Sequence, residues 1–150
     1  MTSTRSQDNT IHIEITHDVI QIIDGIEFVR SNQAGAIVTF LGSTRDNFNG
    51  RQVVRLDYEA YEPLAIRTLH QIATKAKTKW SLHGLSICHR LGTVPVGQDS
   101  MAIAVSSSHR REAWEAGEWI LEQVKAKAEI WKKEIYQDGS EWKANKALPQ

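Results

Sequence analysis

The amino-acid sequence predicts a single α/β (α+β) domain with a mixed sheet. The chain has 150 residues, a length typical of one domain. Hydrophobic residues make up 41% and charged residues 24%, close to the average for globular proteins. Strand-like and helix-like segments follow one another in the order β-α-β-β-α-β-β-α-β, without a repeat or a linker. This order is typical of a mixed sheet with helices packed on it.

The N-terminal part begins with residues 1–10, which offer nothing to bury, so we expect a disordered tail. The domain is then expected over residues 11–150. Isoleucines at positions 11, 13 and 15 alternate with polar residues, which predicts a strand. Asp18 can cap a helix that ends at about Arg30. Its predicted apolar face holds Ile22, Ile23, Ile26 and Val29.

The middle of the chain predicts two strands and a helix. The sequence GAIVTFLG at 35–42 is rich in β-formers and bounded by glycines, which is typical of a buried strand. Residues 44–50 form a turn-rich loop in which Asn49-Gly50 is the strongest turn signal. Residues 53–60 are the expected partner strand. Pro63 suits the first turn of a helix that continues to about Trp80.

The C-terminal half predicts three more strands and a long helix. Strands are expected at 85–91, 100–106 and 130–136, a loop at 92–98, and a turn at Asp138-Gly139. The helix is expected over residues 109–128. Its buried stripe at helical spacing consists of Ala113, Gly117, Ile120, Leu121, Val124 and Ala128.

Composition argues against several classes of protein. The 18 basic and 18 acidic residues cancel, so no global field attracts nucleic acid or an anionic membrane. Cys88 is the one cysteine, which excludes an internal disulfide and a cysteine-based zinc cluster. The histidines lack a ligand spacing such as HExxH, so we expect no metal and no cofactor. Without an apolar signal segment or membrane span, we expect a cytosolic protein.

Positive charge is concentrated at the predicted start of the long helix. If Ser108 is the N-cap, His109 and Arg110 occupy the first turn, where unpaired N–H groups and the helix dipole favour an anion. Arg110 can add bidentate hydrogen bonds to a phosphate or carboxylate. Cations at this end oppose the dipole, which favours a functional role. The alternative is a solvated surface neutralised by Glu112 and Glu115.

Further candidate cations lie after the helix and in one loop. Lys125 is in the last turn, where a cation also simply complements the dipole. In the strand IWKKEIY, alternation places Lys132 and Glu134 on one face and Lys133 on the other. The sequence favours an ordinary surface ion pair, worth about 0–1 kcal/mol, over a pair in a cleft. Arg45 lies in a loop at a strand end, where binding residues are common; alternatively, it is an exposed arginine beside Asp46.

Five stretches of the chain resemble the large, catalytic subunit of molybdopterin synthase. They are GAIVTFLGSTRDN, LDYEAYEPLA, WSLHGLSICHRLGTVPVG, VSSSHRREAWEAG and VKAKAEIWKKEIY with GSEWKANK, in the family's order over residues 34–146. The resemblance implies an α/β hammerhead fold. It also implies a sulfurtransferase that converts cyclic pyranopterin monophosphate (precursor Z) into molybdopterin. The sulfur would come from the thiocarboxylated Gly-Gly tail of a small ubiquitin-like subunit, with two large and two small subunits forming a heterotetramer.

The resemblance also assigns roles to individual residues. Lys125 and Lys132 are expected to be catalytic: Lys125 at the incoming thiocarboxylate, Lys132 in substrate binding and proton transfer. The remaining substrate-binding candidates are Arg45, His109, Arg110, Lys133 and Glu134. Strand alternation turns Lys133 away from Lys132, so it is a candidate for a dimer partner's pocket. Lys146 stands where some relatives carry arginine, and a bidentate contact would not transfer cleanly to lysine.

Two other classes of function remain as alternatives. A non-catalytic scaffold could bind the ubiquitin-like partner without turning over a pterin, although it would not need Arg110, Lys125 and Lys132 together. A nucleic-acid-binding domain could use the same cations. The segment from His109 to Lys146 carries eight basic and eight acidic residues, which disfavours that second alternative.

Overall fold

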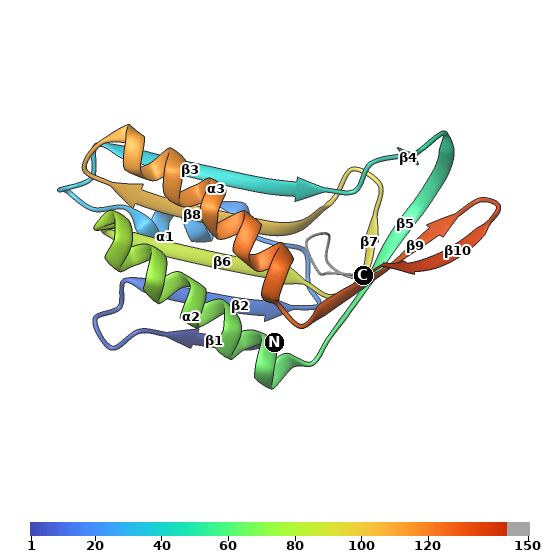
Figure 1. Cartoon of the computed structure of the whole chain (residues 1–150), viewed down its shortest axis with the longest axis horizontal. Coiled ribbons are helices and arrows are strands. Elements are labelled where there is room, and N and C mark those ends of the chain that lie inside the picture. Colours follow the sequence, from blue (N-terminus) through green and yellow to red (C-terminus); the bar gives the residue numbers. More distant parts are fainter. Residues whose placement is uncertain (144–150) are drawn as a thin grey trace.

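The computed structural model describes residues 1–143, and the side chains of residues 1–139. These residues form three helices and two sheets. Figure 1 shows that one sheet projects beyond the end of the other. In chain order the elements are β1 (Thr2–Arg5), β2 (Ile11–Thr16), α1 (Ile22–Val29), β3 (Ala36–Ser43), β4 (Asn47–Phe48), β5 (Arg51–Ala60), α2 (Glu62–Trp80), β6 (Gly84–Arg90), β7 (Gly92–Pro95), β8 (Asp99–Ser107), α3 (Arg110–Lys127), β9 (Ile130–Tyr136) and β10 (Gly139–Lys143).

The larger sheet has the strand order β1-β2-β6-β8-β3. Strands β2 and β6 are parallel, and the other neighbours are antiparallel, so the predicted mixed sheet is confirmed. Helices α2 and α3 lie side by side on one face, and α1 lies on the other (Figure 1). Successive side chains of a strand point to opposite faces. In β6, Ile87 therefore joins the main core, whereas Ser86 lies under Gly25 of α1.

The main core fills the space between the larger sheet and helices α2 and α3. Its largest fully buried side chains include isoleucines of β2, β6 and β8 and residues of both helices. The predicted stripe of α3 is confirmed at five of its six positions, since Leu121 is only partly buried. This packing fixes the position of α3 on the sheet and therefore of the residues at both of its ends.

The second sheet has the order β10-β9-β5-β4, and β7 also pairs with β5. Residues 92–98, predicted to be a loop, contain β7, so that prediction is wrong for Gly92–Pro95. Gly92 has a φ of 77°, a left-handed conformation that glycine adopts without strain. It is the first residue of β7, two positions after the last residue of β6, where the chain passes from the larger sheet to the second sheet. The predicted turn at Asn49-Gly50 is confirmed, with φ values of 50° and 81° between β4 and β5.

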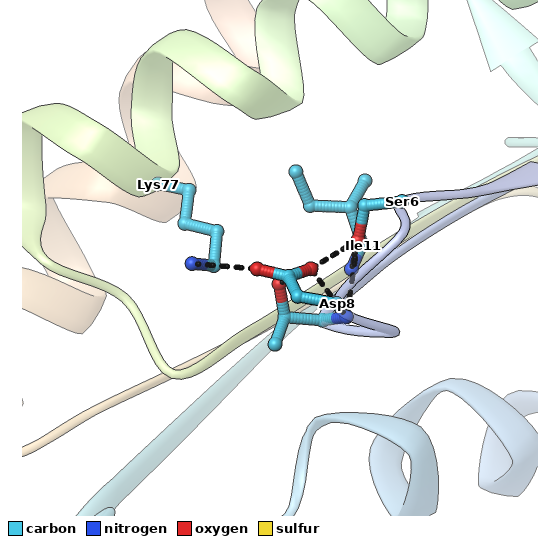
Figure 2. Close-up of polar contacts among 5 residues, drawn as sticks. Ser6, Asp8, Ile11 and Lys77 are labelled. Carbon is cyan, nitrogen blue, oxygen red and sulfur yellow. Dashed lines mark hydrogen bonds and ion pairs between the residues drawn. The ribbon is translucent and has the colours of Figure 1, made fainter.

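The N-terminal segment differs from the disordered tail expected from the sequence, because Thr2–Arg5 pairs with β2. Backbone pairing holds this segment without requiring an apolar sequence. Figure 2 shows how Asp8 organises the turn that follows: its carboxylate accepts from the Ser6 hydroxyl at 2.6 Å and pairs with Lys77 of α2 at 3.6 Å. Hydrogen bonding from Ser6, above all, lowers the pKa of Asp8.

Helix α1 begins later than predicted. Asp18 is not its cap: the N-cap is Gln21, and the Asp18 amide instead donates to the Thr16 hydroxyl at 3.0 Å. The predicted apolar face is also wrong at Ile23, whose residue surface is 64% exposed. The extended segment before the helix buries Ile20 instead. The shorter helix still covers the second face of the larger sheet.

Candidate active site

A cavity of about 230 Å³ lies where the C-terminal end of α3 meets the second sheet. Chain segments far apart in the sequence converge on it, namely β3 and its following loop, β4, β5, β6, β8, α3 and β9. The lining residues are Phe40, Gly42, Ser43, Arg45, Asn47, Phe48, Val53, Leu56, Tyr58, His89, Ser100, Met101, Val124, Lys125, Lys132 and Glu134.

Three of the predicted cations line this cavity. Arg45 is exposed in the loop after β3, whereas Lys125 of α3 and Lys132 of β9 are half-buried. Helix α3 ends at Lys127 and β9 begins at Ile130, so a short connection brings the two lysines to the same cavity. Three positive charges around one partly enclosed space produce a field suited to an anion.

Glu134 places a carboxylate among these cations. Its residue surface is only 5% exposed, and Oε2 accepts a hydrogen bond from the Tyr136 hydroxyl. Lys132 and Glu134 both line the cavity, which confirms the predicted alternation of β9. The preference for an ordinary surface ion pair is wrong, because the sequence pattern does not reveal that β9 closes one side of a cavity.

Lys133 does not line this cavity. It is paired with Asp57 across the β5–β9 ladder, one position out of phase with Lys132. The structure therefore separates Lys133 from the other predicted substrate-binding residues of β9, as strand alternation predicted. Lys146 lies outside the described residues.

An uncharged part of the wall was not predicted from the sequence. It consists of Tyr58, His89 and Ser100. The Tyr58 hydroxyl donates to Ser100 Oγ at 3.2 Å, and the Tyr58 and His89 rings meet edge to face with centroids 5.1 Å apart. Burial lowers the pKa of His89 to about 4 and raises that of Tyr58. The available signal was the alternation of Leu85, Ile87 and His89, which places a histidine on the core face of its strand.

The other predicted cations lie at the opposite end of α3. His109 is the N-cap and Arg110 the first helical residue, and both are exposed. Lys125 is 15 positions after Arg110, or roughly 22 Å along the helix axis. One chain therefore does not bring His109 and Arg110 to the cavity that contains Lys125.

Ser108 is not the N-cap predicted from the sequence. Its hydroxyl is 2.8 Å from His83 Nε2, and the hydroxyl of Ser107 donates to the His109 carbonyl at 2.5 Å. No side-chain cap satisfies the first turn of α3. His109 takes the extended conformation of an N-cap one residue later than predicted, with φ −125° and ψ 153°.

Cys88 lies in β6, on the sheet face opposite to the cavity, where it pairs with Glu14 of β2. Its thiol is 3.8 Å from Glu14 Oε2, and burial is the main cause that raises its pKa to about 12. Such a thiol is a poor nucleophile at neutral pH. Among the described residues, no group of three or more His, Cys, Asp or Glu side chains is arranged to hold a metal ion. No helix in residues 1–143 is long and apolar enough to cross a membrane.

Comparison with known proteins places the chain among molybdopterin synthase subunits. The model of the "MoaE protein" family matches residues 15–127. The molybdopterin synthase catalytic subunit of Pyricularia oryzae is 48% identical over 136 residues, which cover 90% of this chain and 75% of that protein. The crystal structure of molybdopterin synthase from Staphylococcus aureus superposes with a TM-score of 0.83 at 40% identity, covering 87% and 95% of the two chains. A chain from the complex of subunits 1 and 2 of molybdopterin-converting factor from Helicobacter pylori shares the fold at 24% identity, with a TM-score of 0.74 and coverage of 91% and 93%.

Proposed function

The chain belongs to the MoaE protein family, and from this premise we propose that it is the catalytic subunit of a molybdopterin synthase. It is an enzyme of molybdenum cofactor biosynthesis, a sulfurtransferase. The proposed reaction converts cyclic pyranopterin monophosphate (precursor Z) into molybdopterin by installing the two sulfurs of the dithiolene.

The observation that carries this proposal is the convergence of Arg45, Lys125, Lys132 and Glu134 on one cavity. The substrate carries a cyclic phosphate, an anion for which arginine and lysine are the usual protein ligands. The cavity is partly enclosed, so charge interactions inside it are stronger than in open water. Preorganised cations of this kind stabilise negative charge that develops during a reaction.

The sulfur donor in this proposal is a small ubiquitin-like subunit with a thiocarboxylated C-terminal tail. Sulfur that arrives on a partner requires no nucleophilic cysteine in the cavity, which agrees with the position of Cys88 on the opposite sheet face. The tail itself ends in an anion. Lys125, in the last turn of α3, is our candidate for contacting the thiocarboxylate and stabilising charge as sulfur leaves.

The remaining charged residues of the cavity have different roles toward the pterin. Arg45 lies exposed in its loop and is suited to the substrate phosphate. Lys132 binds substrate and transfers a proton to or from the reacting atoms. Glu134 shares its face of β9 and orients the Lys132 ammonium, while the Tyr136 hydroxyl holds the carboxylate in place.

His109 and Arg110 are consistent with this function if two large subunits share their sites. Because these residues lie roughly 22 Å from Lys125 along one helix, a second copy of the chain must supply them to the substrate anion. This arrangement is the self-dimer of a heterotetramer with two small subunits. Lys133, turned away from its own cavity, is a second candidate for contact with the dimer partner.

Reconstitution tests the proposed function directly. The chain is mixed with the thiocarboxylated small subunit and cyclic pyranopterin monophosphate, and molybdopterin is measured through its fluorescent oxidised derivative. We expect product in proportion to the thiocarboxylate consumed. A folded chain that binds the small subunit but forms no product would favour the scaffold alternative.

A further inference from the structure

His89 occupies a position in the cavity wall that the proposed mechanism does not use. It lies in β6 on the face of the larger sheet covered by α2 and α3, and its residue surface is 5% exposed. Its Nδ1 lies 2.9 Å from the carbonyl oxygen of Arg90. A carbonyl oxygen only accepts, so Nδ1 must carry the hydrogen and donate it.

This tautomer leaves a lone pair on Nε2. Burial favours the neutral ring, consistent with a pKa of about 4. Among the residues that the structure describes, the hydrogen-bond partner of the His89 ring is the carbonyl oxygen of Arg90. The ring binds this oxygen through Nδ1. The described side-chain atoms that are sealed from solvent without a partner belong to Arg90, Glu112 and Glu129. His89 Nε2 is not among them, and the ring lines the cavity.

Neighbouring contacts hold the ring in one orientation. The rings of His89 and Tyr58 meet edge to face, with their centroids 5.1 Å apart and their planes at 68°. Tyr58 donates to Ser100, and Ser100 Oγ lies 3.3 Å from the carbonyl oxygen of Gly42, to which it donates in turn. The His89 ring is therefore held at Nδ1 by the Arg90 carbonyl and along its side by the Tyr58 ring.

The charged groups of the cavity differ from His89 in kind. Arg45, Lys125 and Lys132 only donate hydrogen bonds, and they are charged. Glu134 accepts, but its Oε2 already receives the Tyr136 hydroxyl. A ligand that has an anionic group and also an uncharged N–H or O–H group needs an acceptor for that second group. His89 Nε2 is a neutral acceptor at a fixed position.

We propose that His89 Nε2 accepts a hydrogen bond from an N–H or O–H group of the substrate and thereby positions the uncharged part of that molecule in the cavity. A pterin is a heterocycle with several such donors, so the assignment rests on the proposed function. His89 is a neutral ligand to the substrate in this scheme and transfers no proton. It acts beside the cations that hold the phosphate.

Nitrogen NMR of the chain with ¹⁵N-labelled histidine tests this proposal on the wild-type protein. The His89 resonances are assigned by their loss in His89→Gln. At pH 7 we expect a protonated Nδ1 and an unprotonated Nε2. Addition of cyclic pyranopterin monophosphate should shift the Nε2 resonance upfield, as hydrogen bonding to the lone pair requires, while Nδ1 changes little.

Two variants test the same contact by kinetics. A glutamine amide reaches the position of Nε2, whereas an asparagine amide reaches only that of Nδ1. We expect His89→Asn to raise KM about tenfold with a nearly unchanged kcat, the loss of one neutral hydrogen bond, and His89→Gln to recover most of that loss. Cys88→Ala, in the same strand but on the opposite face, is the matched control.

The outcomes separate this inference from the proposed function. Binding of the pterin, measured by isothermal titration calorimetry, with an unmoved Nε2 resonance would overturn the role of His89 while leaving the enzyme assignment intact. A protonated Nε2 in the free protein would do the same. Absence of both pterin binding and molybdopterin formation would overturn the proposed function, and the role of His89 with it.

Discussion

The two ends of helix α3 carry similar charges in different surroundings. At the C-terminal end, Lys125 lines a cavity together with Lys132 and the buried carboxylate of Glu134. At the N-terminal end, His109 and Arg110 are exposed to solvent. Both clusters were recognisable in the sequence as cations near a helix terminus. Positively charged residues near a helix terminus therefore identify a candidate binding site. The cavity that Lys125 lines forms at the end of α3 that meets the second sheet.

The helix dipole acts oppositely on the two clusters. A cation in the last turn is stabilised by about 0.3–1 kcal/mol, and a cation in the first turn is destabilised by a similar amount. Lys125 is therefore compatible with the stability of α3. Arg110 opposes it, which is more easily understood if an anion binds there. The complete site in our proposal needs both ends, one from each of two chains.

Substitution of Lys132 should produce the largest effect at the C-terminal end. Lys132→Ala removes a preorganised cation from the cavity, and loss of such a group typically lowers kcat by about 100- to 1,000-fold. Lys132→Arg keeps the charge but not the compact ammonium, so we expect it to restore KM more than kcat. Steady-state molybdopterin formation measures both constants. Equal activity of Lys132→Ala and wild type would remove Lys132 from the mechanism.

The buried character of the C-terminal end should also appear in the pH dependence of stability. The pKa of His89 is about 4 in the folded chain, against an ordinary value of 6.5. As pH falls below 6.5 the unfolded chain binds a proton before the folded chain does, so stability falls until about pH 4. The expected loss is about 3 kcal/mol.

Urea unfolding of wild type and His89→Gln between pH 7 and 4 measures this difference. The variant should lose less stability on acidification than the wild type. Cys88→Ala is again the control, because the pKa of Cys88 is about 12 and the thiol does not titrate in this range. Identical pH dependence of wild type and His89→Gln would show that His89 is not held neutral by burial.

Substitution at the N-terminal end of α3 should have a smaller effect, and it should change KM rather than kcat. Arg110→Ala removes a charge-assisted contact from an exposed position, for which we expect an increase of about tenfold in KM. Because the partner chain supplies Arg110 in our proposal, chains with Arg110→Ala should complement chains with Lys125→Ala. When equal amounts of the two variants reassemble at random, half of the dimers are mixed, and each contains one unaltered site. Activity no greater than the average of the two variants alone would contradict the shared site.

The sequence predicted most elements because their hydrophobic periodicity is strong. The alternation in β2 and the apolar stripe of α3 both correspond to buried faces. The missed strands β1, β4, β7 and β10 are short and lie at sheet edges or in the second sheet, where backbone pairing rather than apolar pattern holds them. Asp18 was a plausible cap by residue type, yet the chain extends to Gln21 before α1 begins. Local propensity does not reveal such tertiary choices.

The candidate site was predictable in composition but not in geometry. Charge pattern and resemblance indicated Arg45, Lys125 and Lys132, which the fold brings together. The same reasoning grouped them with His109 and Arg110, although the length of α3 keeps these apart within one chain. His89 was missed because the alternation that places it on the core face of β6 does not reveal that this position lines a cavity. Its proposed role depends on the tautomer of the ring and on its place in the cavity wall, and both follow from the three-dimensional structure.

The most direct test of the C-terminal cavity compares two lysines of the same helical turn. Lys125 lines the cavity, and Lys127, two residues later, is exposed and does not. The measurement is single-turnover formation of molybdopterin by Lys125→Ala and Lys127→Ala, each reconstituted with the thiocarboxylated small subunit. We predict a loss of about 100- to 1,000-fold for Lys125→Ala and a rate within about twofold of wild type for Lys127→Ala. Equal rates in the two variants would contradict the assignment of this cavity as the active site.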